Sequence, residues 1–271
     1  MRASIALLIL ACCLSTPLRA DSWPRGRSGS YVYLGAATTS ATTAFDEAGD
    51  RVPFPGKGAR QRRATLYVEA GLTDSLTLVA AAPYQQLTSR GLFSDFTTSG
   101  AADLDLRLRV SRTTSIGVFA AEGGAFIPLG YDRLDFPQLG TGAVEPVVNV
   151  AYGTSIAKLP QGFLSLQLGY RARGGGLSDE IPFSAKVGAF FHPRIGTFVG
   201  VRGWRSRGDF RDTDPTLGLT AADSELLSAA GEIYVRVAPR FDVNAGWARP
   251  LAGRNGGIGN EWSVGVAFHA P

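Results

Sequence analysis

The stretch that decides the fold is ADLDLRLRV, residues 102–110, in which charged and aliphatic side chains alternate without a break. The residues of one parity are Asp103, Asp105, Arg107 and Arg109, and those between them are Leu104, Leu106, Leu108 and Val110. Successive side chains of a β-strand point to opposite faces, so the stretch predicts a strand with one charged and one aliphatic face. In a soluble sheet the charged face would meet water. In an outer-membrane barrel the aliphatic face would meet lipid and the charges would line the lumen.

The same alternation recurs along the chain. We expect twelve strands, roughly nine to thirteen residues each, the length that a tilted membrane strand needs. They are centred on Tyr31–Thr39, Arg62–Leu72, Leu76–Leu87, Ala102–Ser111, Ser115–Pro128, Val144–Thr154, Gly162–Arg173, Ile181–Phe191, Ile195–Ser206, Leu226–Val237, Phe241–Pro250 and Gly259–His269.

The connections between these runs decide between the two arrangements. Long connections such as residues 45–61, 89–101, 130–143 and 207–225 alternate with short ones such as TDS (73–75), RTT (112–114), HPR (192–194) and APR (238–240). The last connection, AGRNGGI (252–258), is counted among the long ones. Bacterial outer-membrane barrels have short periplasmic turns, longer extracellular loops and an even strand number. The sequence therefore predicts an all-β fold, a single transmembrane antiparallel up-and-down β-barrel of about 12 strands, with the leucines of residues 102–110 on lipid.

Parity then predicts which side chains enter the lumen. The charged candidates are Glu69, Asp103, Asp105, Arg107, Arg109, Glu145, Arg171, Arg173, Lys186, Arg202, Glu232, Arg236, Asp242 and Glu261. An Arg or Lys on the lipid face at the bilayer midplane would cost about 2–4 kcal/mol, which excludes the inverted arrangement. The fifth run stays ambiguous, because Glu122 shares its parity with Ile116 and Val118. We expect the four charges of residues 103–109 to pair across the lumen, with the two acids toward the extracellular end.

The N-terminus predicts export. Residues 1–20 have a positive start, an apolar run from Ile5 to Leu14 and a small residue, Ala20, at the expected cleavage site. We therefore expect a signal peptide over residues 1–20, Sec export, a barrel over residues 21–271 and a bacterial outer-membrane location. A lipoprotein signal is the alternative, with lipid on Cys12. The 27 basic and 23 acidic residues nearly balance, which gives no reason to expect nucleic acid as a partner.

Several stretches resemble a known family. The stretches SWPRGRSGSYVYL, FDEAGDRVPF, LYVEAGLTDSLTLVAAAPY, GAADLDLRLRV and IPLG with LGTGAVEPVVNVAYG are similar in order and spacing to the outer-membrane β-barrel family named for the meta-pathway of phenol degradation. The resemblance covers most of residues 21–271. It implies a barrel that admits small compounds, with aromatic compounds as candidates because of the genetic neighbourhood of such barrels, and it implies no catalytic residues.

The residues themselves predict a binding or transport role. The two histidines, His192 and His269, lie near short turns, and we find no catalytic constellation, metal-ligand spacing or phosphate loop, so we expect no enzyme activity and no cofactor. A passive or weakly selective channel for small molecules is the leading hypothesis, and the family resemblance adds aromatic or hydrophobic compounds as candidates. A closed structural barrel without transport is the alternative. The sequence does not indicate an oligomeric state.

Two groups of residues are expected on the surface, one basic and one aromatic. A basic first loop is expected to contact lipopolysaccharide phosphates or, alternatively, to be a solvated loop; its residues are Arg51, Lys57, Arg60, Arg62 and Arg63. Aromatic residues near the short turns are expected to form a periplasmic girdle; they are Phe163, Phe191, Phe241 and Phe268.

Overall fold

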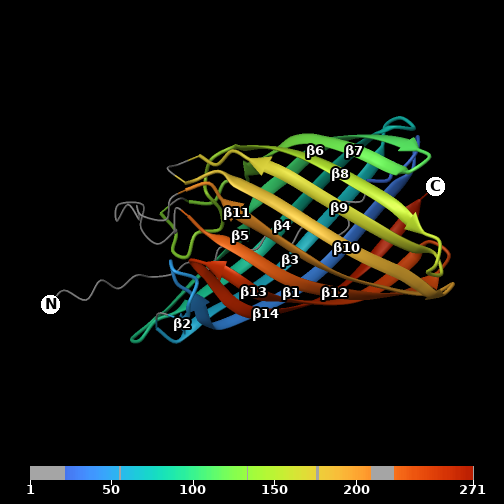
Figure 1. The fold of residues 1–271 in the computed structure, drawn as a ribbon. Coiled ribbons are helices and arrows are strands. Elements are labelled where there is room, and N and C mark those ends of the chain that lie inside the picture. The colour runs from blue at the N-terminus through green and yellow to red at the C-terminus, as the bar shows by residue number, and fades with distance from the viewer. Residues whose placement is uncertain (1–21, 55, 133, 175–176, 209–222, 271) are drawn as a thin grey trace.

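The chain forms a closed antiparallel β-barrel (Figure 1). The computed structural model describes residues 22–54, 56–132, 134–174, 177–208 and 223–270. The expected signal peptide therefore lies outside the described residues. No described residue belongs to a helix long and apolar enough to cross a membrane.

Within the described residues, twelve strands span the barrel. They are β1 (Ser30–Phe45), β3 (Gly58–Gly71), β4 (Leu76–Arg90), β6 (Asp103–Thr114), β7 (Gly117–Pro128), β8 (Glu145–Ile156), β9 (Gly162–Arg171), β10 (Glu180–His192), β11 (Ile195–Ser206), β12 (Glu225–Ala238), β13 (Phe241–Arg254) and β14 (Gly256–Ala270). Each spanning strand pairs with its neighbours in sequence, and β14 closes the barrel on β1 from Ser30↔Ala270 to Phe45↔Gly256. The predicted up-and-down barrel is confirmed.

Two short strands were not predicted. β2 (Arg51–Pro53) pairs with the end of β1, and β5 (Asp95–Ala101) pairs with the end of β4. Both lie in connections that we expected to be loops. They extend the sheet beyond the barrel at the end that carries the long connections, which we call the long-loop end; the opposite end is the short-turn end.

One predicted long connection is wrong. Residues 252–258 do not form a loop, because β13 continues to Arg254 and β14 begins at Gly256, so that Asn255 alone joins them. Asn255 has φ 49°, a left-handed conformation that asparagine tolerates better than most residues. Its backbone N–H donates to the Asp46 carbonyl at 3.1 Å, and its side-chain amide donates to the Asp223 carbonyl at 2.9 Å. These contacts anchor the one-residue junction where the glycine-rich sequence indicated a loop, although the pairing between β13 and β14 themselves ends at Ala248↔Glu261.

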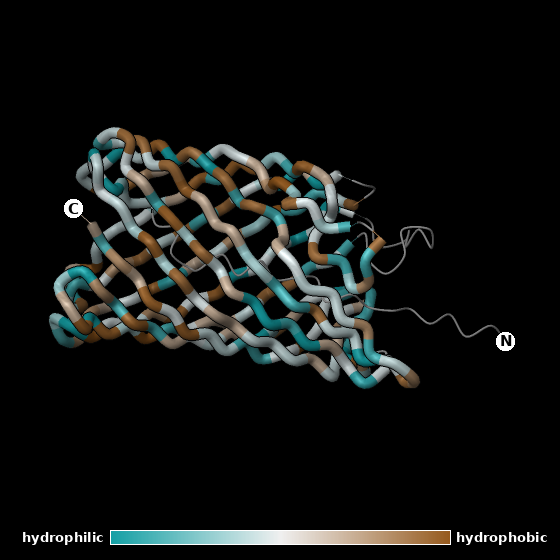
Figure 2. Tube along the Cα trace, turned by 180° about the vertical axis from the view of Figure 1, so that it is seen from behind, coloured by the Kyte–Doolittle hydropathy of each residue, from teal (hydrophilic) through white to brown (hydrophobic). Residues whose placement is uncertain are grey.

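The structure shows which face of the stretch 102–110 points outward. Along β6 the side chain of Arg109 is completely buried, whereas Leu106, Leu108 and Val110 are 37%, 47% and 55% exposed. The barrel therefore turns its charges inward and its aliphatic side chains outward. Polar and apolar residues alternate along individual strands in Figure 2 as well. An outward apolar face of this kind fits lipid and would be unfavourable in water.

The segment before β1 lies inside the barrel at the short-turn end. Trp23 packs edge-on against the Phe163 ring, with centroids 6.3 Å apart, and a Cβ on Gly153 would come within 2.1 Å of the Ser22 hydroxyl oxygen. The Arg25 guanidinium forms an ion pair with Glu69 and lies 4.8 Å from the centroid of the Tyr31 ring. Residues 22–25 thus occupy lumen space next to the short turns. Sequence analysis assigned no such role to them.

Candidate functional site: the lumen

The fourteen charged residues expected in the lumen all lie on the inward face of the barrel, buried or partly buried. Eleven of them belong to four clusters, and Asp103, Lys186 and Glu232 have other partners. The central cluster is formed by β3, β6 and β7, the upper cluster by β8–β10 near the long-loop end, the bridging cluster by β3, β11 and β14, and the lower cluster by β12–β14 near the short turns. Each holds acids and bases together, because a buried charge without a partner is costly.

The central cluster contains three acids and two arginines: Glu69, Asp105, Glu122, Arg107 and Arg109. Arg109 donates from Nε to Glu122 at 2.6 Å and from Nη1 to Glu69 at 3.0 Å. Arg107 forms a bidentate pair with Asp105, at 2.6 and 2.7 Å, and reaches Glu122 at 3.4 Å. Arg25 of the N-terminal segment is the third guanidinium, so that three acids face three bases.

Glu122 is the functional residue that sequence analysis left unassigned. It lies inward on β7, directly opposite Arg109, and also accepts hydrogen bonds from Asn149 at 3.1 Å and Gln167 at 3.4 Å. The sequence did not reveal the inward position of Glu122, because the Ala, Gly and Val residues around it show no polar–apolar alternation. Its opposition to Arg109 could have been found only by fixing the β6–β7 register, which depends on the short turn at residues 115–116.

The charges of β6 pair along the wall. We expected Asp103, Asp105, Arg107 and Arg109 to pair across the lumen, but their partners lie on the same strand or on strands close by. Asp103 instead accepts a hydrogen bond from the Tyr131 hydroxyl at 2.5 Å. The acids do lie toward the long-loop end, where β6 begins. Pairing along the wall keeps these side chains at the perimeter.

The upper cluster joins Glu145, Arg171, Arg173 and Glu180. Arg171 donates to Glu145 at 2.6 Å, and Arg173 donates to Glu180 at 2.6 Å. Beside it, in the connection that follows β9, Asp179 accepts hydrogen bonds from the Tyr170 hydroxyl and, at 2.9 Å, from the Arg173 backbone N–H. These hydrogen bonds, first the one from Tyr170, lower the pKa of Asp179.

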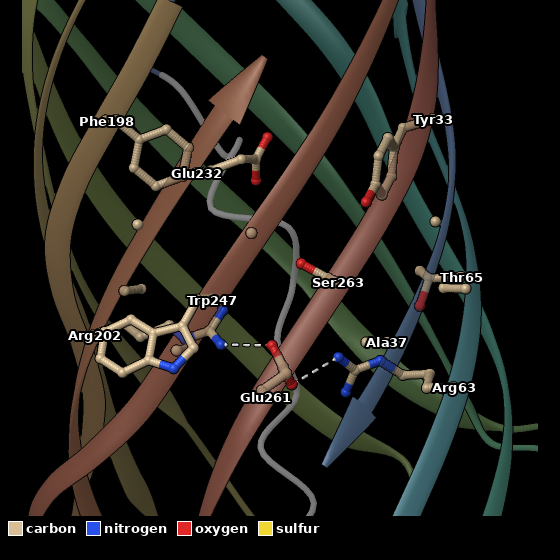
Figure 3. Close-up of a pocket in the computed structure, with 16 residues that line it drawn as sticks. Tyr33, Ala37, Arg63, Thr65, Phe198, Arg202, Glu232, Trp247, Glu261 and Ser263 are labelled. Atoms are coloured by element: carbon tan, nitrogen blue, oxygen red, sulfur yellow. Dashed lines mark hydrogen bonds and ion pairs between the residues drawn. The ribbon is translucent and has the colours of Figure 1, made fainter.

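The bridging cluster spans widely separated strands. Glu261 on β14 accepts from Arg202 on β11 at 2.9 Å and from Arg63 on β3 at 3.2 Å, as the dashed lines in Figure 3 show. Sequence analysis placed Arg63 in a surface loop, but its side chain is buried and points into the lumen. A cavity that opens to solvent adjoins this cluster, with Tyr33, Phe198 and Ser263 in its lining.

Small inward residues make room for this cavity. Gly35, Ala37, Ala230, Gly246, Ala248 and Ser263 line it on β1 and β12–β14. The Tyr33 ring lies flat over the paired Gly35 and Gly265, because a Cβ on either would come within 2.2–2.3 Å of ring or hydroxyl atoms. The two glycines thus allow the Tyr33 ring to pack against the barrel wall. The cavity lies on the side of the lumen formed by β11–β14 and β1.

The lower cluster lies next to the short turns. Arg236 donates to Asp242 at 3.1 Å, and the His269 ring lies 2.8 Å from the other Asp242 oxygen. Higher in the lumen Glu232 accepts from the Asn244 amide at 2.5 Å, and the Lys186 ammonium lies 5.6 Å from the Phe198 ring centroid. Across the described ranges, no group of three or more His, Cys, Asp or Glu side chains is placed to hold a metal ion.

The expected aromatic girdle is partly wrong. Phe191 and Phe241 are exposed on the outward face, and Phe268 packs against Phe241 with ring centroids 5.0 Å apart. Phe163 instead points into the lumen against Trp23. Its parity agrees with that of Gln167 and Arg171 on the same strand, so the sequence pattern already placed it inside, and nearness to a turn was misleading.

Comparisons with known proteins place the fold. No protein-family model matches the chain, and no curated protein matches it. Similar solved structures include an outer membrane channel from Pseudomonas putida F1, with TM-score 0.72 and 15% identity over 94% of this chain and 99% of that chain. They also include the NanC porin (TM-score 0.53, 9% identity, 88% and 98% covered) and the translocator domain of the autotransporter NalP from Neisseria meningitidis (0.51, 14%, 89% and 88%). At these identities the similarity concerns the fold, which is that of outer-membrane barrels.

Proposed function

We propose that this protein is a channel of the bacterial outer membrane that lets small molecules pass along one side of its lumen. The observation that carries the proposal is the cavity beside β11–β14 and β1, where small residues leave space while bulky ion-paired side chains gather on β3, β6 and β7. A twelve-stranded barrel is wider than the eight-stranded barrels that side chains fill. The resemblance of its fold to an outer membrane channel and a porin supports the proposal.

The proposed orientation puts the long-loop end outside the cell and the short turns in the periplasm, after Sec export. The usual loop asymmetry of bacterial outer-membrane barrels supports it. The proposed solutes are small molecules with an aromatic or hydrophobic body, since the Tyr33 and Phe198 rings line the cavity beside paired charges that offer few free polar groups. Membership of the family named for the meta-pathway of phenol degradation, inferred from sequence resemblance, is part of this proposal.

A closed barrel without transport is the second candidate. Residues 22–25 favour it, because Ser22, Trp23 and Arg25 occupy lumen space at the short-turn end. The ion-paired clusters would serve equally well as internal cross-links in such a barrel. The two functions differ in one measurable quantity, the ionic conductance of the purified protein in a planar bilayer.

The test compares two neighbouring residues of β14 that face opposite ways. Ser263 lines the cavity, whereas Val264 is 59% exposed on the outward face. We expect the wild-type barrel to give discrete single-channel steps, Ser263→Phe to lower their size by about half or more, and Val264→Phe to leave it unchanged. Silent traces from correctly folded wild-type protein would overturn the channel in favour of the closed barrel. Equal conductance in both variants would overturn the proposed path.

A further inference from the structure

The outward face of the barrel carries a basic patch at the long-loop end, over β1, β3, β4 and β5. We define the patch as three arginines with the polar side chains around them: Arg60 and Arg62 on β3, Arg90 on β4, Thr38 and Ser40 on β1, Gln86 and Thr88 on β4, and Thr97 and Ser99 on β5. The β-pairing brings them together, since Arg62 lies opposite Thr38 and Gln86, and Arg60 lies opposite Ser40 and Thr88. Thr88 and Thr97 share a hydrogen bond of 3.0 Å between their hydroxyls, which fixes them on the same face.

The patch begins where the apolar outward face stops. On the same strands the outward residues nearer the short turns are Leu34, Leu66 and Val68, and the last large one is Tyr84, which is 57% exposed and lies opposite Ala64. Moving along β3 from Ala64 toward the long-loop end, the next outward residue is Arg62 and the one after it is Arg60. Each step is about 6.8 Å along an antiparallel strand, or about 5 Å of height for a strand tilted by about 40°. Tyrosine favours the membrane interface, so Arg62 and Arg60 lie about 5 and 10 Å above it.

The three arginines have no acidic partner. Among the described residues, no carboxylate forms an ion pair with Arg60, Arg62 or Arg90, although Asp95 lies opposite Arg90 in the β4–β5 pairing. The buried Nε of Arg60 has no hydrogen-bond partner. Two outward arginines on β11 and β13 at this end differ, because Arg205 and Arg254 both pair with Glu225, at 4.0 and 3.2 Å. The patch therefore carries positive charge that the protein itself does not neutralise.

We propose that this patch binds the phosphate groups of lipopolysaccharide in the outer leaflet. The guanidinium of an arginine matches a phosphate in a bidentate geometry, and such charge-assisted hydrogen bonds are about twice as strong as neutral ones. The hydroxyls of Thr38, Ser40, Thr88 and Thr97 and the amide of Gln86 supply further donors at the same height. Acyl chains of the same lipid would lie against Leu34, Leu66 and Tyr84 below. Lys57 adds a cation at this corner, since its backbone N–H donates to the Arg90 carbonyl at 2.7 Å.

This patch differs from the set of basic residues that the sequence predicts to contact lipopolysaccharide. Arg63 does not belong to it, because it points into the lumen and pairs with Glu261. Arg51 lies apart on β2, with its guanidinium 5.9 Å from the Phe45 ring. Strand parity decides which arginines belong to the patch, because Arg60 and Arg62 face outward on β3 whereas Arg63 faces inward. A binding site on the outward face is independent of whether the lumen conducts.

The experiment measures binding of purified lipopolysaccharide to the folded full-length barrel in detergent, by native mass spectrometry and by the shift in Tm on titration. The variant is Arg60→Gln/Arg62→Gln/Arg90→Gln. The matched control is Arg205→Gln/Arg249→Gln/Arg254→Gln, which removes three outward arginines of β11 and β13 at the same end, outside the patch. We expect the patch variant to bind at least tenfold more weakly and the control to bind within twofold of wild type. Arg62→Gln alone provides the comparison if the triple variant folds poorly, with an expected loss of about threefold.

Two arms identify the ligand chemistry. Lipopolysaccharide stripped of its lipid A phosphates should bind wild type as weakly as intact lipopolysaccharide binds the patch variant. Phosphatidylglycerol in micelles of equal charge should raise the Tm of wild type and patch variant equally. Equal binding of lipopolysaccharide by patch variant and control would overturn the proposal. So would phosphatidylglycerol binding that depends on the three arginines as strongly as lipopolysaccharide binding does.

Discussion

Removing the charge of Glu122 should destabilise the barrel more than any other single neutral substitution in the central cluster. Glu122 is 5% exposed and accepts from two guanidiniums and two amides, with Arg109 at 2.6 Å as the shortest contact. In Glu122→Gln, three guanidiniums (Arg25, Arg107 and Arg109) would share two carboxylates, and Arg109 has no exposed surface through which water could replace the lost partner. Breaking a buried pair by removing one partner typically costs about 3–5 kcal/mol, which is the expected loss in the free energy of unfolding.

The assay is urea-dependent unfolding in lipid vesicles, followed by tryptophan fluorescence. Glu225→Gln is the control, because Glu225 also sits between two arginines but at an exposed rim, where we expect a loss below about 1 kcal/mol. In Arg109→Met/Glu122→Met the pair is removed together, so the loss should be smaller than in either single variant. A loss below about 1 kcal/mol in Glu122→Gln would refute the reasoning, since it would mean that water in the lumen already screens the cluster.

Three further outcomes follow from the same architecture. Leu106→Arg should lower the free energy of unfolding in vesicles by about 2–4 kcal/mol, while Leu106→Ala costs much less; equal costs would contradict an outward lipid-facing side chain. In intact cells a membrane-impermeant thiol reagent should label Lys57→Cys and miss Asp74→Cys, and the reverse would invert the orientation. Because the pKa of Asp179 is lowered, its hydrogen bond with Tyr170 stabilises the folded protein above the unfolded pKa of about 3.9, and this stabilisation is lost as pH falls through the lower folded pKa. Amide exchange near residue 173 should therefore rise only under strongly acidic conditions. A rise near pH 6 would argue against this role of the hydrogen bond.

Strand positions and faces could be predicted because two independent patterns agree in this sequence. Alternation with period two locates a strand and its faces, and alternating connection lengths give the topology. The four charges of β6 are informative because each would be expensive on lipid, so that they allow one orientation only. A strand whose charges share a parity, such as β10 with Glu180 and Lys186, could be oriented in the same way.

Pairings were harder to predict, because they depend on register and not on parity. Parity places Arg109 inside the barrel, but its partners Glu122 and Glu69 follow from the alignment of β6 with β7 and from a diagonal reach across β4. On β7 the sequence around Glu122 is too rich in small residues to reveal a face. The inward position of residues 22–25 left no periodic signal either, since that segment is held by individual contacts such as Arg25 with Glu69.

The one-residue junction at Asn255 makes the barrel unevenly tolerant of inserted residues. Extra residues in the connections after β1 or β7 would lengthen loops and leave the strands in register. One residue added at Asn255 has no loop to absorb it, because β13 is paired with β12 up to Arg254, β14 is paired with β1 from Gly256, and Asn255 itself contacts Asp46 and Asp223. It would slide β14 by one position, turn Glu261 toward lipid and bring Trp262 and Val264 inward, into the volume that Ser263 now leaves open. Length variation among natural relatives should therefore gather in the other connections and avoid this one.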